Sequence, residues 1–280
     1  MPYRSMLVHL DSDPLCASRT RLAIAFAKER DCHLVGLAPT GLVDLPAVPG
    51  SASSLADYAA LAWDTLRDTA ESVTERFRED CRAAGVKSFE ALIDEAEVAA
   101  SLVSHAHCCD ITLLSQASPQ PQRQRIAQAL VEDVVLRSAR PTLVVPHAGR
   151  FETFGRSVMV AWDDSREAAR ALADALPLLV HAKRVQVVTW NEAGTRSDDT
   201  LRPRLDAVHR WLMWHGVSAD MRIETTDIGI AEAMLSRAAD FGADLIVMGA
   251  YGHARWAERV LGGATRGLLA AMTVPVLMSH

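Results

Sequence analysis

The chain has 280 residues, of which 49% are hydrophobic and 23% charged, and its net charge is −6 at pH 7. This composition is typical of a globular protein, and the length suggests two domains of ordinary size. A pI of about 5.9 without a basic cluster argues against nucleic-acid binding. No apolar stretch approaches the roughly 20 residues that span a bilayer, and the amino terminus lacks the apolar core of a signal peptide. We therefore expect a cytoplasmic protein that has no membrane partner.

The five cysteines all lie in the first half of the chain and do not form the pattern of a disulfide framework. Cys108 and Cys109 belong to the segment His105–Asp110, which is rich in potential metal ligands. Its spacing fits no zinc pattern, so we predict no metal site there. Redox sensitivity of the adjacent cysteine pair stays an open alternative.

The first half alternates between strand-like and helix-like patterns. The predicted strands are Ser5–Leu10, His33–Leu37, Phe89–Ile93, Ile111–Leu114 and Thr142–Val145, and the predicted helices are Ser18–Arg30, Leu55–Ala84, Glu95–His105 and Ile126–Ser138. Two segments, Pro39–Ser54 and Gln116–Gln124, are predicted loops because the first is rich in Pro, Gly and Ser and the second is polar. Strands joined by helices in this way indicate an α/β domain with a parallel sheet.

The same alternation restarts after the polar segment His147–Gly155, which we interpret as a linker. The predicted strands of the second half are Ser157–Trp162, Val185–Trp190, Ala219–Glu224, Leu245–Met248 and Val274–Met278, and the predicted helices are Arg166–Leu179, Leu201–His215 and Ile228–Asp240, with a further helix after the last glycines.

An internal duplication connects the two halves. Three pairs of equivalent residues are each 134 positions apart: Asp110 with Asp244, Ser115 with Gly249, and Pro141 with Pro275. Asp11 and Asp163, which follow the first strand of each half, are 152 positions apart because the first half has the longer loop Pro39–Ser54. We predict two tandem domains, 1–147 and 155–280.

Four glycines punctuate the end of the second half. Gly249 and Gly252 follow a predicted strand, and Gly262 and Gly263 precede a predicted helix. We expect Gly249 to permit a sharp turn and Gly252 to let phosphate oxygens approach backbone N–H groups. The free N–H groups at the start of the helix favour an anion. The alternative is that these glycines are only turns and a helix cap. The chain has neither a P-loop nor a dinucleotide-binding fingerprint.

The spacing Gly249-x2-Gly252-x9-Gly262-Gly263 resembles the nucleotide-binding signature G-x2-G-x9-G-[S/T] of the universal stress protein (UspA) family. Gly263 stands where the nucleotide binders of the family usually have Ser or Thr. The resemblance implies two tandem doubly wound α/β domains of the adenine nucleotide α hydrolase-like type, each with a five-stranded parallel sheet. It also implies that Thr142–Val145 and Pro275–Met278 pair antiparallel within the chain.

The resemblance further implies an ATP site, with Mg²⁺ as a possible companion, in the second domain. Its expected residues are Ala161, Asp163, Trp190, Met248, Gly249, Gly252, Gly262, Gly263, Ala264 and Thr265. Asp163 would face the adenosine, although Asp163 and Ser165 can equally cap the following helix. Trp190 can equally be a core residue. Arg255, Arg259 and Arg266 could neutralise phosphate charge, although a solvated helix face explains the first two equally well.

The first domain lacks all four glycines at the equivalent positions. It has Ser115 and Ser118 in place of the first pair and Gln128 and Ala129 in place of the second. Side chains at these positions would crowd a phosphate chain away from the backbone. We therefore predict that the first domain is a degenerate partner of the second.

No catalytic constellation is evident in the sequence. The leading hypothesis is therefore a regulatory protein that binds an adenine nucleotide during stress and is not an enzyme. The alternatives are a stress protein that acts through protein–protein interaction without a nucleotide, and a slow ATPase. Association of two chains into a homodimer stays open.

Overall fold

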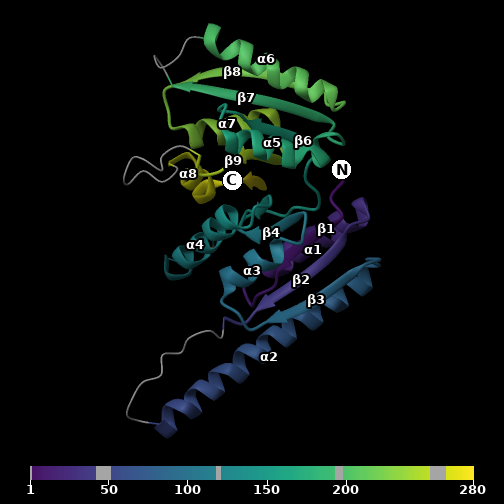
Figure 1. Ribbon diagram of the computed structural model, residues 1–280, viewed down its shortest axis with the longest axis vertical. Coiled ribbons are helices and arrows are strands. Elements are labelled where there is room, and N and C mark those ends of the chain that lie inside the picture. Colours follow the sequence, from purple (N-terminus) through teal and green to yellow (C-terminus); the bar gives the residue numbers. More distant parts are fainter. Residues whose placement is uncertain (1, 42–51, 118–120, 193–197, 253–262) are drawn as a thin grey trace. The chain divides into compact units, whose positions relative to one another are not determined.

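The computed structural model describes residues 2–41, 52–117, 121–192, 198–252 and 263–280. They form two compact units. The first unit is Tyr3–Leu113, and the second consists of Leu114–His280 with the first two residues of the chain. No helix within the described ranges is both long and apolar enough to cross a membrane. Both units have the predicted α/β architecture, in which helices alternate with mainly parallel strands (Figure 1).

The unit Tyr3–Leu113 is built on parallel strands in the order β3-β2-β1-β4. Its elements are β1 (Ser5–His9), α1 (Leu15–Arg30), β2 (His33–Pro39), α2 (Ala52–Ala84), β3 (Phe89–Asp94), α3 (Val98–Ala106) and β4 (Ile111–Ser115), the last of which ends in the next unit. The long helix α2 lies along β2 and β3 (Figure 1). Gly36 of β2 permits this close packing, because a Cβ on Gly36 would lie 2.8 Å from the ring of Phe77 in α2.

The unit Leu114–His280 has strands in the order β5-β10-β9-β6-β7-β8. Its elements are α4 (Pro121–Arg137), β5 (Thr142–Val145), β6 (Ser157–Ala161), α5 (Arg166–Leu179), β7 (Arg184–Glu192), α6 (Asp198–Trp214), β8 (Asp220–Thr226), α7 (Ile230–Phe241), β9 (Leu245–Gly249), α8 (Gly263–Ala271) and β10 (Val276–Ser279). All neighbouring strands of this order are parallel except β10 and β5, which are antiparallel with Val276 opposite Val144.

The central strands form because they are short, continuous apolar runs that can be buried on both faces of a parallel sheet. In β6 and β9, for example, all residues but one terminal residue are buried. An aspartate fixes the start of a central strand in each unit. Asp110 accepts hydrogen bonds from the backbone N–H groups of Arg4 and Ser5, and Asp244 accepts one from the N–H of Ser157 at 2.9 Å. Asp110 therefore has a structural function in the segment that had suggested a metal site.

Two predicted loops end too late. Pro39–Ser54 was predicted to be a loop, but α2 begins within it at Ala52. Gln116–Gln124 was predicted to be a loop, but α4 begins within it at Pro121. Proline suits the first turn of a helix because its fixed φ is helical and the N–H that it lacks has no partner there in any case. Most of the predicted loop Pro39–Ser54 lies outside the described residues, as do Gly262, His253, Arg255, Arg259 and Ser118.

Candidate functional site

The candidate site lies where β9 ends, beside the first turn of α8. Ala250 follows β9, and its N–H donates to the carbonyl of Ser279 at the end of β10. The N–H of Tyr251 points to Oγ1 of Thr265 at 3.5 Å, and Thr265 is a buried residue in the first turn of α8. The glycine turn, residues 249–252, is therefore held against the N-terminus of α8.

Gly249 is needed for close packing and does not supply the left-handed backbone of the turn. A Cβ on Gly249 would lie 2.5 Å from the backbone nitrogen of Ala168 in the first turn of α5, so no side chain fits there. The residue of the turn with a left-handed conformation is Tyr251, whose φ is 59°. Such a conformation is strained for a bulky residue, and strain of this kind concentrates at functional sites. The expectation that Gly249 supplies the sharp turn is corrected accordingly.

Gly252 faces a carboxylate of the protein itself. A Cβ on Gly252 would lie 2.7 Å from Oε2 of Glu167, a residue of α5 that is only 4% exposed. Burial acts to raise the pKa of Glu167, but hydrogen bonds from the side chain of Arg166 and from the residue's own N–H outweigh it and hold the pKa below its usual value. The turn expected to receive phosphate therefore faces the carboxylate of Glu167. This contact had no sequence signal, because a Glu in the first turn of a helix is ordinary.

Among the described residues, nothing covers the N-terminus of α8: Gly263 is exposed, and a Cβ on it would meet none of their atoms within 4 Å. Ala264 and Thr265 follow it in the same turn. Arg266 forms an ion pair with Glu132 of α4, with 3.2 Å between Nε and Oε1. Arg266 is thus engaged by a carboxylate of the protein.

The carboxyl ends of β6, β7 and β9 bring the remaining predicted residues to the same edge of the sheet. Because β6 pairs with both β7 and β9, Ala161, Trp190 and Met248 all lie near this edge. Ala161 and Met248 are buried, so their side chains belong to the core. The indole N–H of Trp190 is buried and has no acceptor among the described residues, and the same holds for Trp162 directly after β6. Sequence reasoning did not single out Trp162, because a tryptophan at a strand end usually belongs to the core.

Asp163 takes part in the capping arrangement that the sequence left open as an alternative. One of its oxygens accepts a hydrogen bond from the N–H of Ser165 at 3.0 Å, and Oγ of Ser165 accepts one from the N–H of Ala168 as the N-cap of α5. Asp163 is nevertheless exposed at the edge of the sheet. It can therefore hold the cap and still face a ligand.

In the first half, the counterpart of the glycine turn has a different use. Gln116, which corresponds to Ala250 in the repeat, is only 4% exposed. Its amide nitrogen donates to the carbonyl of Leu269 at 2.7 Å and to that of Ala270 at 3.3 Å, while its oxygen accepts a hydrogen bond from the N–H of His147. This side chain thus caps the C-terminal end of α8.

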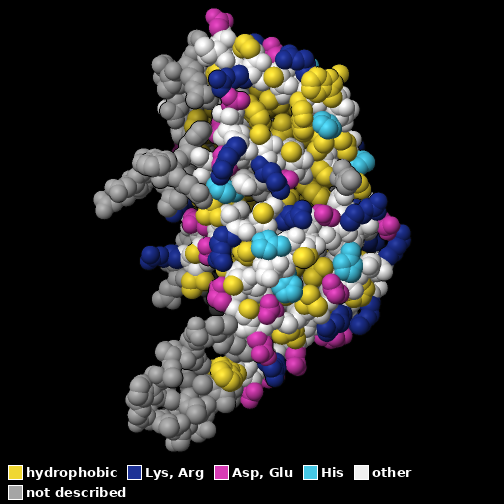
Figure 2. Space-filling model, in the orientation of Figure 1, with side chains coloured by type: hydrophobic (Ala, Val, Ile, Leu, Met, Phe, Trp, Pro, Cys, Tyr) yellow, Lys and Arg dark blue, Asp and Glu magenta, His cyan; other side chains and the backbone are white. Residues whose placement is uncertain are grey.

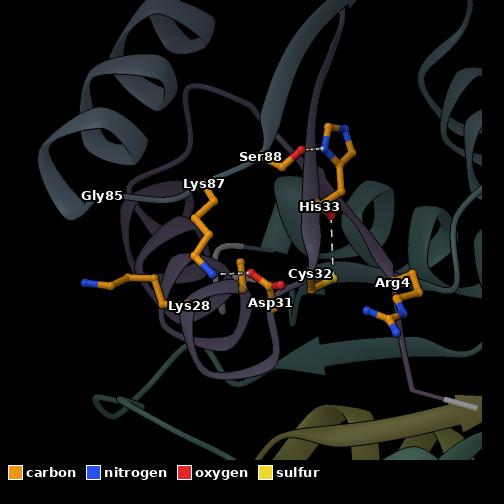
Figure 3. Close-up of a pocket in the computed structure, with 9 residues that line it drawn as sticks. Arg4, Lys28, Asp31, Cys32, His33, Gly85, Lys87 and Ser88 are labelled. Atoms are coloured by element: carbon orange, nitrogen blue, oxygen red, sulfur yellow. Dashed lines mark hydrogen bonds and ion pairs between the residues drawn. The ribbon is translucent and has the colours of Figure 1, made fainter.

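A cavity of about 460 Å³ lies away from this site, in the unit Tyr3–Leu113, at the amino-terminal ends of its strands (Figure 3). Arg4, Lys28 and Lys87 line it together with Asp31, and Nζ of Lys87 lies 2.9 Å from Oδ1 of Asp31. The cavity also adjoins the C-terminus of α1, where cations complement the negative end of the helix dipole. These charges have a sufficient structural explanation, so we do not assign a ligand to this cavity.

Comparison with known proteins identifies the second half of the chain. Residues 155–280 match the model of the universal stress protein family. They form a universal stress protein domain. This confirms the family predicted from the glycine spacing for that part of the chain, whereas a comparison with the curated proteins finds no match.

Solved structures extend the likeness to the whole chain. A universal stress protein from Archaeoglobus fulgidus DSM 4304 has a TM-score of 0.77 at 17% identity, over 99% of this chain and 96% of that one. A functionally unknown protein from Pseudomonas aeruginosa PAO1 has a TM-score of 0.61 at 15% identity, over 99% of this chain and 92% of that one. At these identities the likeness shows the fold alone, and it includes the half that precedes the universal stress protein domain. The tandem form fits this full-length match.

Proposed function

We propose that the universal stress protein domain binds an adenine nucleotide, ATP with Mg²⁺ being the first candidate, and that the protein uses it as a regulatory signal. The observation that carries this proposal is the N-terminus of α8, which lies beside the glycine turn and which no described residue covers. Unpaired backbone N–H groups and the helix dipole attract phosphate at such a place. No side chain at Gly263 obstructs them.

The strand ends supply a place for the nucleoside. The exposed carboxylate of Asp163 can accept hydrogen bonds from ribose or adenine. The buried N–H groups of Trp162 and Trp190 have no acceptor among the described residues, and a buried donor without a partner is costly. A ligand that brings acceptors to this edge would remove that cost. In the proposed arrangement the phosphates lie at α8 and the nucleoside at β6 and β7.

A regulatory response suits this site better than turnover. Within the described ranges, no three His, Cys, Asp or Glu side chains come together in a way that could hold a metal ion. Glu167 does face the turn, but it is held by Arg166 and lacks a partner base in the described site. Slow hydrolysis is tested by phosphate release from the same samples.

The proposal is tested by calorimetric titration of the full chain with ATP and Mg²⁺. We expect micromolar binding that is lost in Gly252→Val, because the new side chain would collide with the carboxylate of Glu167 and fill the turn. Gly229→Val is the matched control, since a Cβ there meets no atom within 4 Å. No heat of binding in the wild type, or equal binding in Gly252→Val, would overturn the proposal.

An interaction function is the second candidate, and one observation favours it. The large apolar side chains of Val180, Met213, Trp214 and Ile228 are exposed in the unit Leu114–His280, and Trp214 is 79% exposed. Figure 2 shows hydrophobic side chains gathered over the part of this unit that contains α5 and the end of α6. Exposed apolar surface of this kind marks interaction sites. A protein that binds no nucleotide but loses a partner upon Trp214→Ser would support this alternative.

A further inference from the structure

The carboxylate of Glu167 is placed where a phosphate oxygen would have to approach the glycine turn. Its Oε2 lies 2.7 Å from the position of a Cβ on Gly252, and the side chain is 5% exposed. Among the described residues its ion-pair partner is Arg166, which is 74% exposed, lies on the same turn of α5 and contacts Oε1 through its Nε. The other oxygen, Oε2, therefore faces Gly252 of the glycine turn.

Two backbone N–H groups in the first turn of α5 are already engaged. The N–H of Ala168 donates to Oγ of Ser165, and the N–H of Glu167 interacts with its own carboxylate. His280 lies close enough to favour the ionised carboxylate, but its Nδ1 is directed to the carbonyl oxygen of Ala250 at 2.9 Å. A metal-free phosphate at Gly252 would thus meet Oε2 of Glu167, because Arg166 pairs with the other carboxylate oxygen, Oε1.

We propose that Glu167 determines the charge of the ligand at the glycine turn, so that a nucleotide phosphate enters together with a divalent cation and not as the free anion. This rests on the proposed nucleotide function and deepens it. Mg²⁺ is well suited because it binds through one or two carboxylates together with substrate phosphates, and keeps several water molecules. The cation would lie between Glu167 and the phosphate, and would convert a repulsion between two anions into a bridge.

If so, the effect of Glu167 on ligand affinity should increase with the number of phosphates on the ligand. A nucleoside without phosphate places no negative charge at the turn, so its binding should not respond to the charge of residue 167. ATP without a cation places the most charge there and should respond most. Two anions this close repel strongly in a partly buried site, and we expect the effect on metal-free ATP to be about tenfold or more.

The experiment measures ATP binding by calorimetry, with excess Mg²⁺ and with EDTA, for the wild type, Glu167→Gln and Glu167→Asp. We expect the wild type to bind at least about tenfold more weakly in EDTA. Glu167→Gln should bind metal-free ATP more tightly and lose most of this dependence on Mg²⁺, whereas Glu167→Asp, which keeps the charge, should retain it. Adenosine binding should be equal in all three proteins. Circular dichroism checks that each variant is folded.

Glu232→Gln is the matched control, because Glu232 is an exposed glutamate in the first turn of α7 in the same unit. It should behave as the wild type does. If the wild type binds ATP and Glu167→Gln shows the same dependence on Mg²⁺, the assignment of Glu167 is wrong while the proposed function stands. If none of these proteins binds ATP with Mg²⁺, the proposed function itself is wrong, and the assignment of Glu167 falls with it.

Discussion

Arg19 and Asp11 form an ion pair in the unit Tyr3–Leu113, with 3.1 Å between Nη2 of Arg19 and Oδ2 of Asp11. The arginine side chain is 1% exposed, and its Nε also donates to the carbonyl of His9. Asp11 is the repeat counterpart of Asp163, which we place near the nucleoside in the second half. In the first half, therefore, Arg19 binds the carboxylate of Asp11. In the second half, the equivalent carboxylate of Asp163 is exposed at the edge of the sheet.

We predict that Asp11→Asn destabilises the protein by about 2 kcal/mol, because it leaves the buried guanidinium of Arg19 without its counter-ion. Part of the usual cost of breaking a buried pair is avoided, since the carboxylate of Asp11 is 30% exposed. The free energy of unfolding in urea measures this. Asp163→Asn is the matched control and should change it by less than about 0.5 kcal/mol, because asparagine keeps a side-chain acceptor for the N–H of Ser165 at this exposed position. Equal effects of the two changes would contradict the prediction.

The stability of the unit Tyr3–Leu113 should fall between pH 6.5 and about pH 4 through His9. Burial, and secondarily the charge of Arg19, lowers the pKa of His9 to about 4. Between these pH values His9 binds a proton in the unfolded chain but stays neutral in the folded protein. Its contribution to the free energy of unfolding is therefore complete above pH 6.5 and is lost as the pH falls. The shift corresponds to a loss of about 3 kcal/mol.

This dependence is measured by urea unfolding across the pH range, with His9→Gln as the comparison. The variant cannot take up the proton and should lose most of the slope between pH 6.5 and 4. Carboxyl groups with lowered pKa values, such as Asp94 and Asp220, also stabilise the folded protein. They lose this contribution to stability only as the pH falls below about 4. An unchanged slope in His9→Gln would show that another group is responsible.

Gly249→Ala should destabilise the unit Leu114–His280 by about 3 kcal/mol, because its new methyl group would overlap the backbone of Ala168 and α5 would have to move. Thermal unfolding followed by circular dichroism measures the change. Gly263→Ala provides the comparison and should be neutral or slightly stabilising, since it adds a better helix former in open space. A Gly249→Ala variant as stable as the wild type would mean that α5 adapts easily.

Gly263→Ser restores the residue type that nucleotide-binding relatives usually have at this position. The added hydroxyl has open space and can donate a hydrogen bond to phosphate, so we expect binding of ATP with Mg²⁺ to tighten about three- to tenfold. Calorimetry is the measurement, and Gly263→Ala, which adds no hydroxyl, should leave the affinity within about twofold of the wild type. Equal affinities of the serine and alanine variants would place the phosphates elsewhere.

The architecture was predictable because its signals are local and repeated. Buried strands show as short apolar runs, and the constant offset between Asp110 and Asp244 marks residues that fix the start of a central strand in both units. The start of α4 was missed because its first residues are polar and include Pro121, which resembles a loop residue when read alone. The boundary between domains at residues 147 and 155 stays a prediction. The compact units divide between Leu113 and Leu114, and β5 groups with the second half, where it pairs with β10.

The candidate site was only partly predictable, because its decisive contacts join residues far apart in the sequence. The four glycines were visible as a spacing, but the reason for Gly249 is its contact with the backbone of Ala168. The close approach of the Glu167 carboxylate to Gly252 depends on how closely α5 packs against the end of β9. Similarly, the unpaired indole N–H of Trp162 is a property of the folded environment and has no sequence signal.

The antiparallel pairing of β5 and β10 has a consequence for synthesis of the protein. Val144 and its partner Val276 are separated by nearly half of the chain, so β5 leaves the ribosome long before the strand that covers its edge. An uncovered strand edge invites pairing with other chains. Until β10 has been synthesised, the nascent protein therefore has an uncovered strand edge that can pair with other chains, and a chain that stops before β10 keeps this edge. Synthesis of β10 therefore completes the sheet and also prevents β5 from pairing with other chains.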